Sequence, residues 1–266
     1  MTEVHTEPSV QAPVQEPPAP PVPKPAHSGG TNSLQSLAAT IVIAVFVITF
    51  VVQAFQIPSP SMETTLMVGD YLLVDKVHDG HSWLWRWLMP YEPIRRQDII
   101  VFRYPLDPKQ HFVKRVVAVP GDRVRLIDKH VYVNSVRQDD HYATFHWEQP
   151  DAFRDNFPDG NLLTLGISSR WYLQVQKLLE NGELIVPEGS YFALGDNRDD
   201  SSDSRYWGFV PAESIVGRPL VIYWSVLRAN AEGFEGRPSD KLSSLAYDFT
   251  HLLQNLRWRR MLQIVH

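Results

Sequence analysis

The sequence predicts a mainly β, antiparallel domain that follows one apolar N-terminal helix. No Asp, Glu, Lys or Arg occurs between Lys24 and Glu63. From Gly69 onward, short runs rich in β-branched residues alternate with Pro, Gly and Asp turns. The expected organisation is a disordered tail at 1–34, a transmembrane helix at 35–57, the β domain at 58–228 and a partly helical extension at 229–266.

The N-terminal tail is predicted to be disordered because it cannot form a core. Residues 1–34 hold 8 of the 21 prolines and few large apolar side chains. Such a segment buries too little apolar surface to offset the entropy lost on ordering.

The apolar run that follows is long enough to cross a bilayer. Leu37 to Ile57 contains 13 Leu, Ile, Val or Phe residues in 21 positions, and a helix of that length spans roughly 31 Å. A buried core helix would show a polar stripe, which this run lacks. A cleaved signal peptide would follow a short basic leader, whereas this leader is long, acidic and proline-rich. We therefore expect a retained transmembrane helix.

The β domain is predicted to contain an inserted subregion at about 139–182, where the strand pattern is lost and a short helix is expected at Trp171–Leu179.

The composition limits the kinds of site that the chain can form. The absence of cysteine excludes disulfides, thiolate zinc sites and a cysteine nucleophile. A net charge of -5 gives no reason to expect nucleic acid. The predicted strands are 71–75, 98–104, 112–119, 123–128, 130–133, 183–186, 191–194 and 220–224.

Two clusters could supply a nucleophile and a base. Ser59 and Ser61 follow the apolar run directly; they either solvate a bend or include a nucleophile, which requires a neighbouring base. Lys114 lies in a predicted strand whose alternation places it on the same face as Phe112 and Val116. Most strand lysines reach water, but burial lowers the pKa of lysine. A fall from ~10.4 to ~7.5 corresponds to roughly 4 kcal/mol of desolvation.

A third cluster, Gly195 to Gly208, is rich in Asp and Ser but does not fit a calcium loop. An EF-hand beginning at Asp196 requires an oxygen ligand, Gly and Glu at its third, sixth and twelfth positions. The sequence has Arg198, Ser201 and Trp207 there. The arginines instead favour a loop stiffened by internal ion pairs, suited to supporting a site.

Together these clusters resemble the successive motifs of bacterial type I signal peptidases. The resemblance covers about residues 36–226 and implies the coiled antiparallel β-sheet fold of that family. Proline is common in the family where Thr64 stands, and glycine or alanine where Pro60 stands. The matching segments are Ile57–Met62, Gly69–Asp70, Asp98–Pro105, Val113–Asp122 and Gly195–Val210.

The resemblance implies a Ser/Lys endopeptidase without metal or cofactor. Ser61 matches the nucleophile and Lys114 the general base. Ser59 matches the serine that forms the oxyanion hole with the Ser61 backbone N–H. Ser201 matches the serine that orients the lysine, and Asp203 and Arg205 match a supporting ion pair. The residues implied as walls of the substrate pocket are Ile57, Met62, Leu66, Phe112 and Val113.

The implied substrates are signal peptides of exported preproteins. The implied location is the cytoplasmic membrane, with the catalytic domain on its outer side, in contact with lipid and near the secretion machinery. Two alternatives remain at the level of sequence: a self-cleaving Ser/Lys protein of the SOS-repressor type, and a catalytically silent, membrane-anchored β domain that binds peptides or lipid. The transmembrane helix and the Gly195–Gly208 cluster disfavour the first, and intact Ser61 and Lys114 disfavour the second.

Other basic residues leave further alternatives. His78, His81 and His111 lie between the serine and lysine clusters, so a histidine base is conceivable, although strand alternation points His111 away from Lys114. In the C-terminal extension, Arg257, Arg259 and Arg260 are expected either to attract anionic lipid or to be solvated.

Overall fold

The computed structural model of the chain describes residues 29–46, 52–75, 93–158, 167–227 and 255–265. The chain divides into two units, Met1–Ile43 and Ala44–His266. The predicted tail at 1–34 lies almost entirely outside the described residues, as do His78 and His81.

The first described element is helix α1, Gly29–Phe46. Within the described ranges, none of the helices is both long and apolar enough to cross a membrane. The prediction of one helix over 35–57 is wrong at its C-terminal end, because Val52–Gln56 forms strand β1. This segment pairs residue by residue with β2 (Asp70–Asp75), from Val52 opposite Asp75 to Gln56 opposite Tyr71. Ala54 and Gln56 are exposed while Phe55 between them is partly buried, an alternation that is typical of a strand rather than of a helix. Residues 47–51 lie outside the described part.

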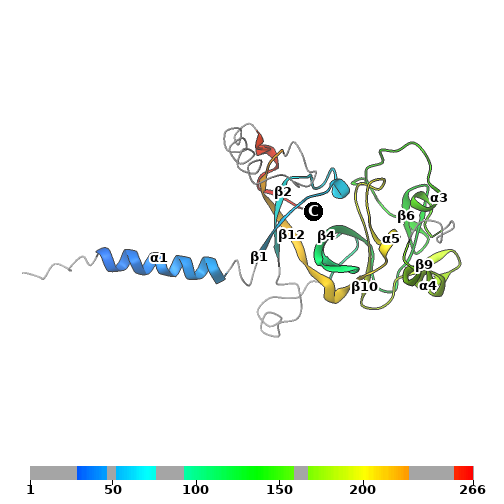
Figure 1. Cartoon of the computed structure of the whole chain (residues 1–266), viewed down its shortest axis with the longest axis horizontal. Coiled ribbons are helices and arrows are strands. Elements are labelled where there is room, and N and C mark those ends of the chain that lie inside the picture. The colour runs from blue at the N-terminus through cyan, green and yellow to red at the C-terminus, as the bar shows by residue number, and fades with distance from the viewer. Residues whose placement is uncertain (1–28, 47–51, 76–92, 159–166, 228–254, 266) are drawn as a thin grey trace, which may run out of the picture. The chain divides into compact units, whose positions relative to one another are not determined.

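The larger sheet has the strand order β1-β2-β12-β3-β4-β10-β11, with β13 also paired to β12. All its pairings are antiparallel. Figure 1 shows β1, β2 and β12 at one side of this sheet and β10 toward the other. The strands are β1, β2 (Asp70–Asp75), β3 (Ile99–Tyr104), β4 (Asp107–Ala118), β10 (Ser190–Leu194), β11 (Val210–Pro211), β12 (Ile215–Ser225) and β13 (Gln263–Ile264).

The smaller sheet, in the order β7-β6-β5-β9-β8, is also antiparallel. Figure 1 shows α3, α4, β6 and β9 grouped together. The short helix predicted at Trp171–Leu179 is present as α4, which Ser168 caps by accepting a hydrogen bond from Trp171 N. The elements are β5 (Arg123–Ile127), β6 (His130–Val133), β7 (Val136–Arg137), β8 (Leu179–Glu180), β9 (Glu183–Ile185), α3 (Ala152–Asp155) and α4 (Ser169–Leu178).

The prediction of a mainly β antiparallel fold is confirmed. Three apolar clusters fill the domain. One lies beneath the smaller sheet and includes Phe153, Trp171 and Phe192. The other two lie on the larger sheet, one around Ile100 and Trp207 and one around Met62 and Leu72. β4 pairs with both β3 and β10, so a side chain near its C-terminal end can be fully enclosed. The remaining short helices are η2 (Pro60–Met62), α5 (Ser204–Trp207), η5 (Ala212–Ser214) and η6 (Trp258–Arg260).

Candidate active site

The loop from Ile57 to Asp70 carries the two candidate serines, and we refer to it as the serine loop. Its ends are joined by backbone hydrogen bonds from Ile57 N to Asp70 O and from Gly69 N to Ile57 O. Between them, Pro60 begins a single 3-10 turn that ends at Met62, where the fixed φ of proline suits a first helical position. Met62 is buried in the apolar cluster of the larger sheet. The apolar residue next to Ser61 thus anchors the loop in the core.

Ser61 and Lys114 come together in this site, although 53 positions separate them in the sequence. Lys114 Nζ lies 2.6 Å from Ser61 Oγ. Lys114 sits on β4 opposite Ile100 of β3, and its side chain is only 4% exposed. Ser61 is also buried. The sequence placed Lys114 on the same strand face as Phe112, and Lys114 Nζ lies 5.6 Å from the centre of that ring.

Burial lowers the pKa of Lys114 from its ordinary 10.5 to about 8. Loss of hydration is the largest cause, because it disfavours the ammonium form. The carboxylates of Asp203, Asp196 and Asp200 act in the opposite direction and raise the pKa, while the Arg205 guanidinium lowers it. The amine is therefore largely protonated at neutral pH and becomes a free base in mildly alkaline solution.

A cleft of about 520 Å³ opens beside the pair. Four of the five residues predicted as pocket walls line it: Ile57, Met62, Phe112 and Val113. The fifth, Leu66, is not among the lining residues; it is fully buried in the core cluster that also holds Met62. Leu66 N donates to Met62 O, so this residue shapes the serine loop from within.

Ser59 is exposed and lines the cleft. Its Oγ is 3.4 Å from Ser61 Oγ. A hydroxyl at this distance from Ser61 Oγ can turn toward an oxygen bound next to Ser61.

The cluster Gly195–Gly208 lies directly behind the pair, and Asp203 is its centre. Asp203 is fully buried and accepts hydrogen bonds from Arg205 Nε and Nη2 and from Gly195 N. The predicted ion pair between Asp203 and Arg205 is therefore present, at 2.8 Å. The Ser201 hydroxyl is buried in the same cluster but makes no hydrogen bond to any described residue, Lys114 included.

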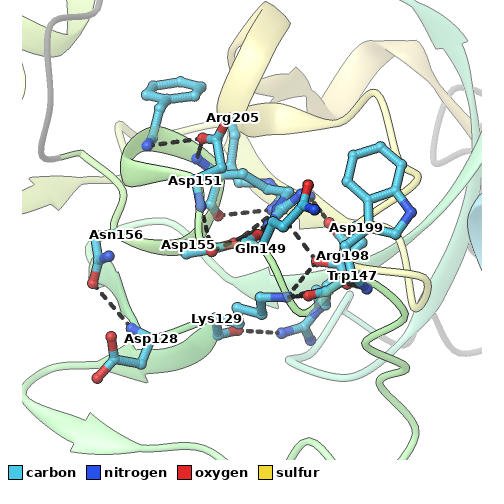
Figure 2. A network of polar contacts seen from close by, with 12 residues as sticks. Asp128, Lys129, Trp147, Gln149, Asp151, Asp155, Asn156, Arg198, Asp199 and Arg205 are labelled. Atoms are coloured by element: carbon cyan, nitrogen blue, oxygen red, sulfur yellow. Dashed lines mark hydrogen bonds and ion pairs between the residues drawn. The ribbon is translucent and has the colours of Figure 1, made fainter.

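A wider polar network joins this cluster to the inserted subregion (Figure 2). Asp199 accepts backbone hydrogen bonds from His146 and Trp147 and forms ion pairs with Lys129 and Arg154. Arg205 reaches the same region, because its Nη1 donates to the Arg154 carbonyl. The inserted residues near 146–155 are thus attached to the Gly195–Gly208 cluster.

His111 also lines the cleft, but its ring packs against Phe55 at a centroid distance of 5.2 Å. Burial lowers the pKa of His111, and Arg103 lowers it further. Among the described residues, the basic group within hydrogen-bond distance of Ser61 Oγ is the Lys114 amine. The described residues also contain no group of three His, Asp or Glu side chains arranged to hold a metal ion.

Sequence reasoning missed several residues that hold the serine loop. Asn197 N donates to the carbonyl of Ser61, and Asp196 accepts from Thr65 Oγ1 while it is paired with Arg115. Asp196 and Asn197 follow Gly195 directly. The motif therefore indicated a structural role for these residues, but it did not show that they contact the serine loop. Arg257 and Arg260, expected to meet lipid or water, instead form ion pairs with the buried Asp70. That expectation was wrong, because a carboxylate excluded from water requires cationic partners.

Comparison with known proteins gives consistent matches across most of the chain. A family model described as signal peptidase, peptidase S26, matches residues 31–224. A signal peptidase I from Buchnera aphidicola is 32% identical over 264 residues, covering 81% of this chain and 82% of the relative. A signal peptidase I from Aquifex aeolicus is 33% identical over 247 residues, covering 81% and 93%. One from Pseudomonas fluorescens is 34% identical over 205 residues, covering 72% and 71%.

Proposed function

The chain belongs to the signal peptidase family, peptidase S26. On this premise we propose that it cleaves signal peptides from exported preproteins. We propose Ser61 as the nucleophile and Lys114 as the general base. The observation that carries this assignment is the 2.6 Å contact between Lys114 Nζ and Ser61 Oγ in a buried site. A serine hydroxyl becomes a useful nucleophile only when a base is positioned to take its proton.

In the proposed acylation step, the neutral Lys114 amine takes the proton of Ser61 Oγ while that oxygen attacks the scissile carbonyl. The tetrahedral intermediate collapses when the resulting ammonium gives its proton to the leaving amine, and the new N-terminus departs. Lys114 is then neutral again; it takes a proton from the water that attacks the acyl-enzyme and returns that proton to Ser61 Oγ as the acyl group leaves. The lowered pKa, about 8, supports this role because a fraction of the amine is already unprotonated near neutral pH.

The developing oxyanion is assigned to the Ser61 backbone N–H and the Ser59 hydroxyl. Support comes from the position of Ser59 in the cleft and from its 3.4 Å distance to Ser61 Oγ. A donor that is already in place when charge develops on the carbonyl oxygen is typically worth ~3–4 kcal/mol. Asp203 and Arg205 are assigned a supporting role, because this buried ion pair acts on Lys114 with both signs: Asp203 raises the pKa of the amine and Arg205 lowers it. Ser201 is assigned to lysine orientation on motif position alone.

The substrate is proposed to lie extended along the cleft beside β4. The apolar walls, Ile57, Met62, Phe112 and Val113, fit small apolar side chains at the first and third positions before the cleaved bond. The Gln110 and Asp200 side chains add polar groups to the same cleft.

Membrane attachment is part of the proposal. It is supported by the uncharged stretch between Lys24 and Glu63, which ends at the serine loop. In this arrangement the catalytic domain faces the extracytoplasmic side, and the serine loop follows the apolar segment closely enough for the enzyme to act on preproteins as they leave the membrane. Membrane lipid and the secretion machinery are then its neighbours.

The assignment is tested with Ser61→Ala, Lys114→Ala and Lys114→Arg in the full-length chain. Each variant is expected to lose preprotein processing by at least ~10³-fold, since neither the hydroxyl nor the amine is sufficient alone, and arginine cannot accept the proton. Cleavage of a preprotein in detergent is measured by gel shift, with circular dichroism to establish that each variant is folded. His111→Ala is the control and is expected to retain activity. Substantial turnover by Lys114→Ala together with an inactive His111→Ala would replace the lysine with a histidine base.

A further inference from the structure

Asp70 is a fully buried carboxylate at the point where the serine loop enters β2. It accepts hydrogen bonds from Met67 N and Ser225 Oγ, and from the guanidinium groups of Arg257 and Arg260. A buried charge is tolerated only when such partners compensate for its lost hydration. The pairing with two arginines therefore explains how a carboxylate can lie at this end of the loop.

Both arginines belong to one short segment, Asn255–Val265, which we call the C-terminal segment. It lies beyond residues 31–224, which match the family model. Figure 1 draws it in red beside β2 and β12. Its β13 strand pairs with Val221 and Ile222 of β12, and Val265 packs against the apolar cluster that holds Met62. The C-terminal segment is thus an integral part of the larger sheet.

The two arginines also hold the backbone of the serine loop. Arg260 Nη2 donates to the carbonyl of Thr65 at 2.9 Å, and Arg257 Nη2 donates to the carbonyl of Val68 at 2.6 Å. The approach is close at the next residue. Gly69 has φ +88°, and a Cβ there would collide with the Val226 carbonyl and lie 3.3 Å from Arg257 Nη2. Only glycine fits this contact without strain.

The contacts continue from Thr65 to the residues beside the catalytic pair. Thr65 Oγ1 donates to Asp196, whose carboxylate also pairs with Arg115, the neighbour of Lys114 on β4. The adjacent Asn197 N donates to the Ser61 carbonyl. A shift of Thr65 would therefore be transmitted both toward the Lys114 strand and toward Ser61.

We propose that Arg257 and Arg260 are positioning residues for catalysis: by holding Asp70, Thr65 O and Val68 O, they fix the serine loop at the geometry that Ser61 needs to meet Lys114. This inference rests on the proposed function for its catalytic consequence, whereas its structural part concerns the loop alone. Displacement of a reacting atom by about 1 Å can cost ~10²-fold in rate. The guanidinium of Arg260 contacts both Asp70 and Thr65 O. A lysine ammonium supplies the charge but not this divided geometry.

The test compares Arg260→Ala and Arg260→Lys with Arg259→Ala in the full-length protein. Arg259 is a matched control, because it lies in the same 3-10 turn and is exposed. We measure kcat and KM for a preprotein well below the melting temperature, the melting temperature itself, and hydrogen exchange in peptides that cover residues 57–70.

For Arg260→Ala we expect a ~10- to 100-fold loss of kcat, a KM within about threefold of wild type and faster exchange in the serine loop. For Arg260→Lys we expect a melting temperature close to wild type, because the charge opposite Asp70 is restored, but a kcat that stays low and an exchange that stays fast. Arg259→Ala should match the wild type in every measurement.

The proposal is overturned if Arg260→Lys regains full kcat, which would reduce the arginine to a stabilising charge, or if serine-loop exchange is unchanged in Arg260→Ala. An inactive wild-type protein would instead overturn the proposed function, and the exchange data would still decide whether the arginines hold the loop.

Discussion

Two fully buried aspartates, Asp70 and Asp203, belong to the segments around the proposed catalytic pair, and they differ in where their partners come from. Asp203 is paired with Arg205, two residues away, within one motif. Asp70 is paired with Arg257 and Arg260, which are 187 and 190 residues away. Of these two aspartates, Asp203 is the one whose charge raises the pKa of Lys114. We therefore expect the local pair to affect the pKa of Lys114, and the long-range cluster to act on the serine loop that carries Ser61.

The burial of the partners differs as well. Arg205 is 1% exposed, so it has no access to water if its partner is lost. The side chains of Arg260 and Arg257 are 15% and 20% exposed and can turn partly toward solvent. Loss of a partner is therefore more costly in the Asp203 pair, since an uncompensated charge in a dry site is strongly destabilising.

The largest expected effect follows from Asp203→Asn. It should lower the free energy of unfolding by ~3–5 kcal/mol, because Arg205 is left buried without its countercharge. Removal of the Asp203 charge also lowers the pKa of Lys114, so the residual activity should rise at lower pH than in the wild type. Urea unfolding and the pH dependence of kcat/KM measure the two effects.

Asp70→Asn is the matched control for Asp203→Asn. It should cost less stability and leave the position of the pH profile unchanged. The proposed difference between the two aspartates is wrong if Asp70→Asn shifts the pH profile of kcat/KM as far as Asp203→Asn does.

A second prediction concerns Lys114, the buried charge whose close partner is a hydroxyl rather than a carboxylate. Its pKa is about 8 in the folded protein and about 10.5 when unfolded. The unfolded state therefore binds more protons between these values, and wild-type stability should rise as pH increases from 8 to 10.5. Below pH 8 the full penalty applies, on the order of 3 kcal/mol.

Lys114→Met, which keeps the length of the side chain without the charge, should therefore be more stable than the wild type at pH 7. The advantage should shrink as the pH approaches 10. Urea unfolding at pH 7, 8.5 and 10 measures this difference. A pH-independent advantage would mean that packing, not charge, separates the two proteins, and the lowered pKa would lose its support.

The same contrast explains how much of the molecule the sequence could predict. Strand positions followed from local composition, and Lys114 was expected on an apolar strand face because alternation needs only neighbouring residues. The Asp203–Arg205 pair was implied by a local motif and is present. Contacts between distant segments were not predictable in this way: nothing local connects Asp70 with Arg257, or distinguishes the buried Leu66 from the residues that line the cleft. The helix predicted over 35–57 failed at β1 because an apolar run carries no signal for its pairing with β2.

The smallest expected effect concerns Asp200, an exposed carboxylate near Lys114, and it is compared with the effect of the buried Asp203. Asp200 lines the cleft and raises the pKa of Lys114, but its side chain is exposed. Asp200→Asn should therefore lower the pKa of Lys114 and increase kcat/KM at pH 7 by less than about threefold, the scale of a solvent-exposed charge pair. Because salt screens exposed charges, the difference from wild type should disappear in ~1 M salt. The effect of Asp203→Asn should persist there, since Asp203 is enclosed. Measurement of kcat/KM against pH at low and high salt compares the two variants directly. A salt-resistant effect of Asp200→Asn would show that this carboxylate contacts the substrate or the base directly, and the distinction between local tuning and solvent-screened charge would then have to be redrawn.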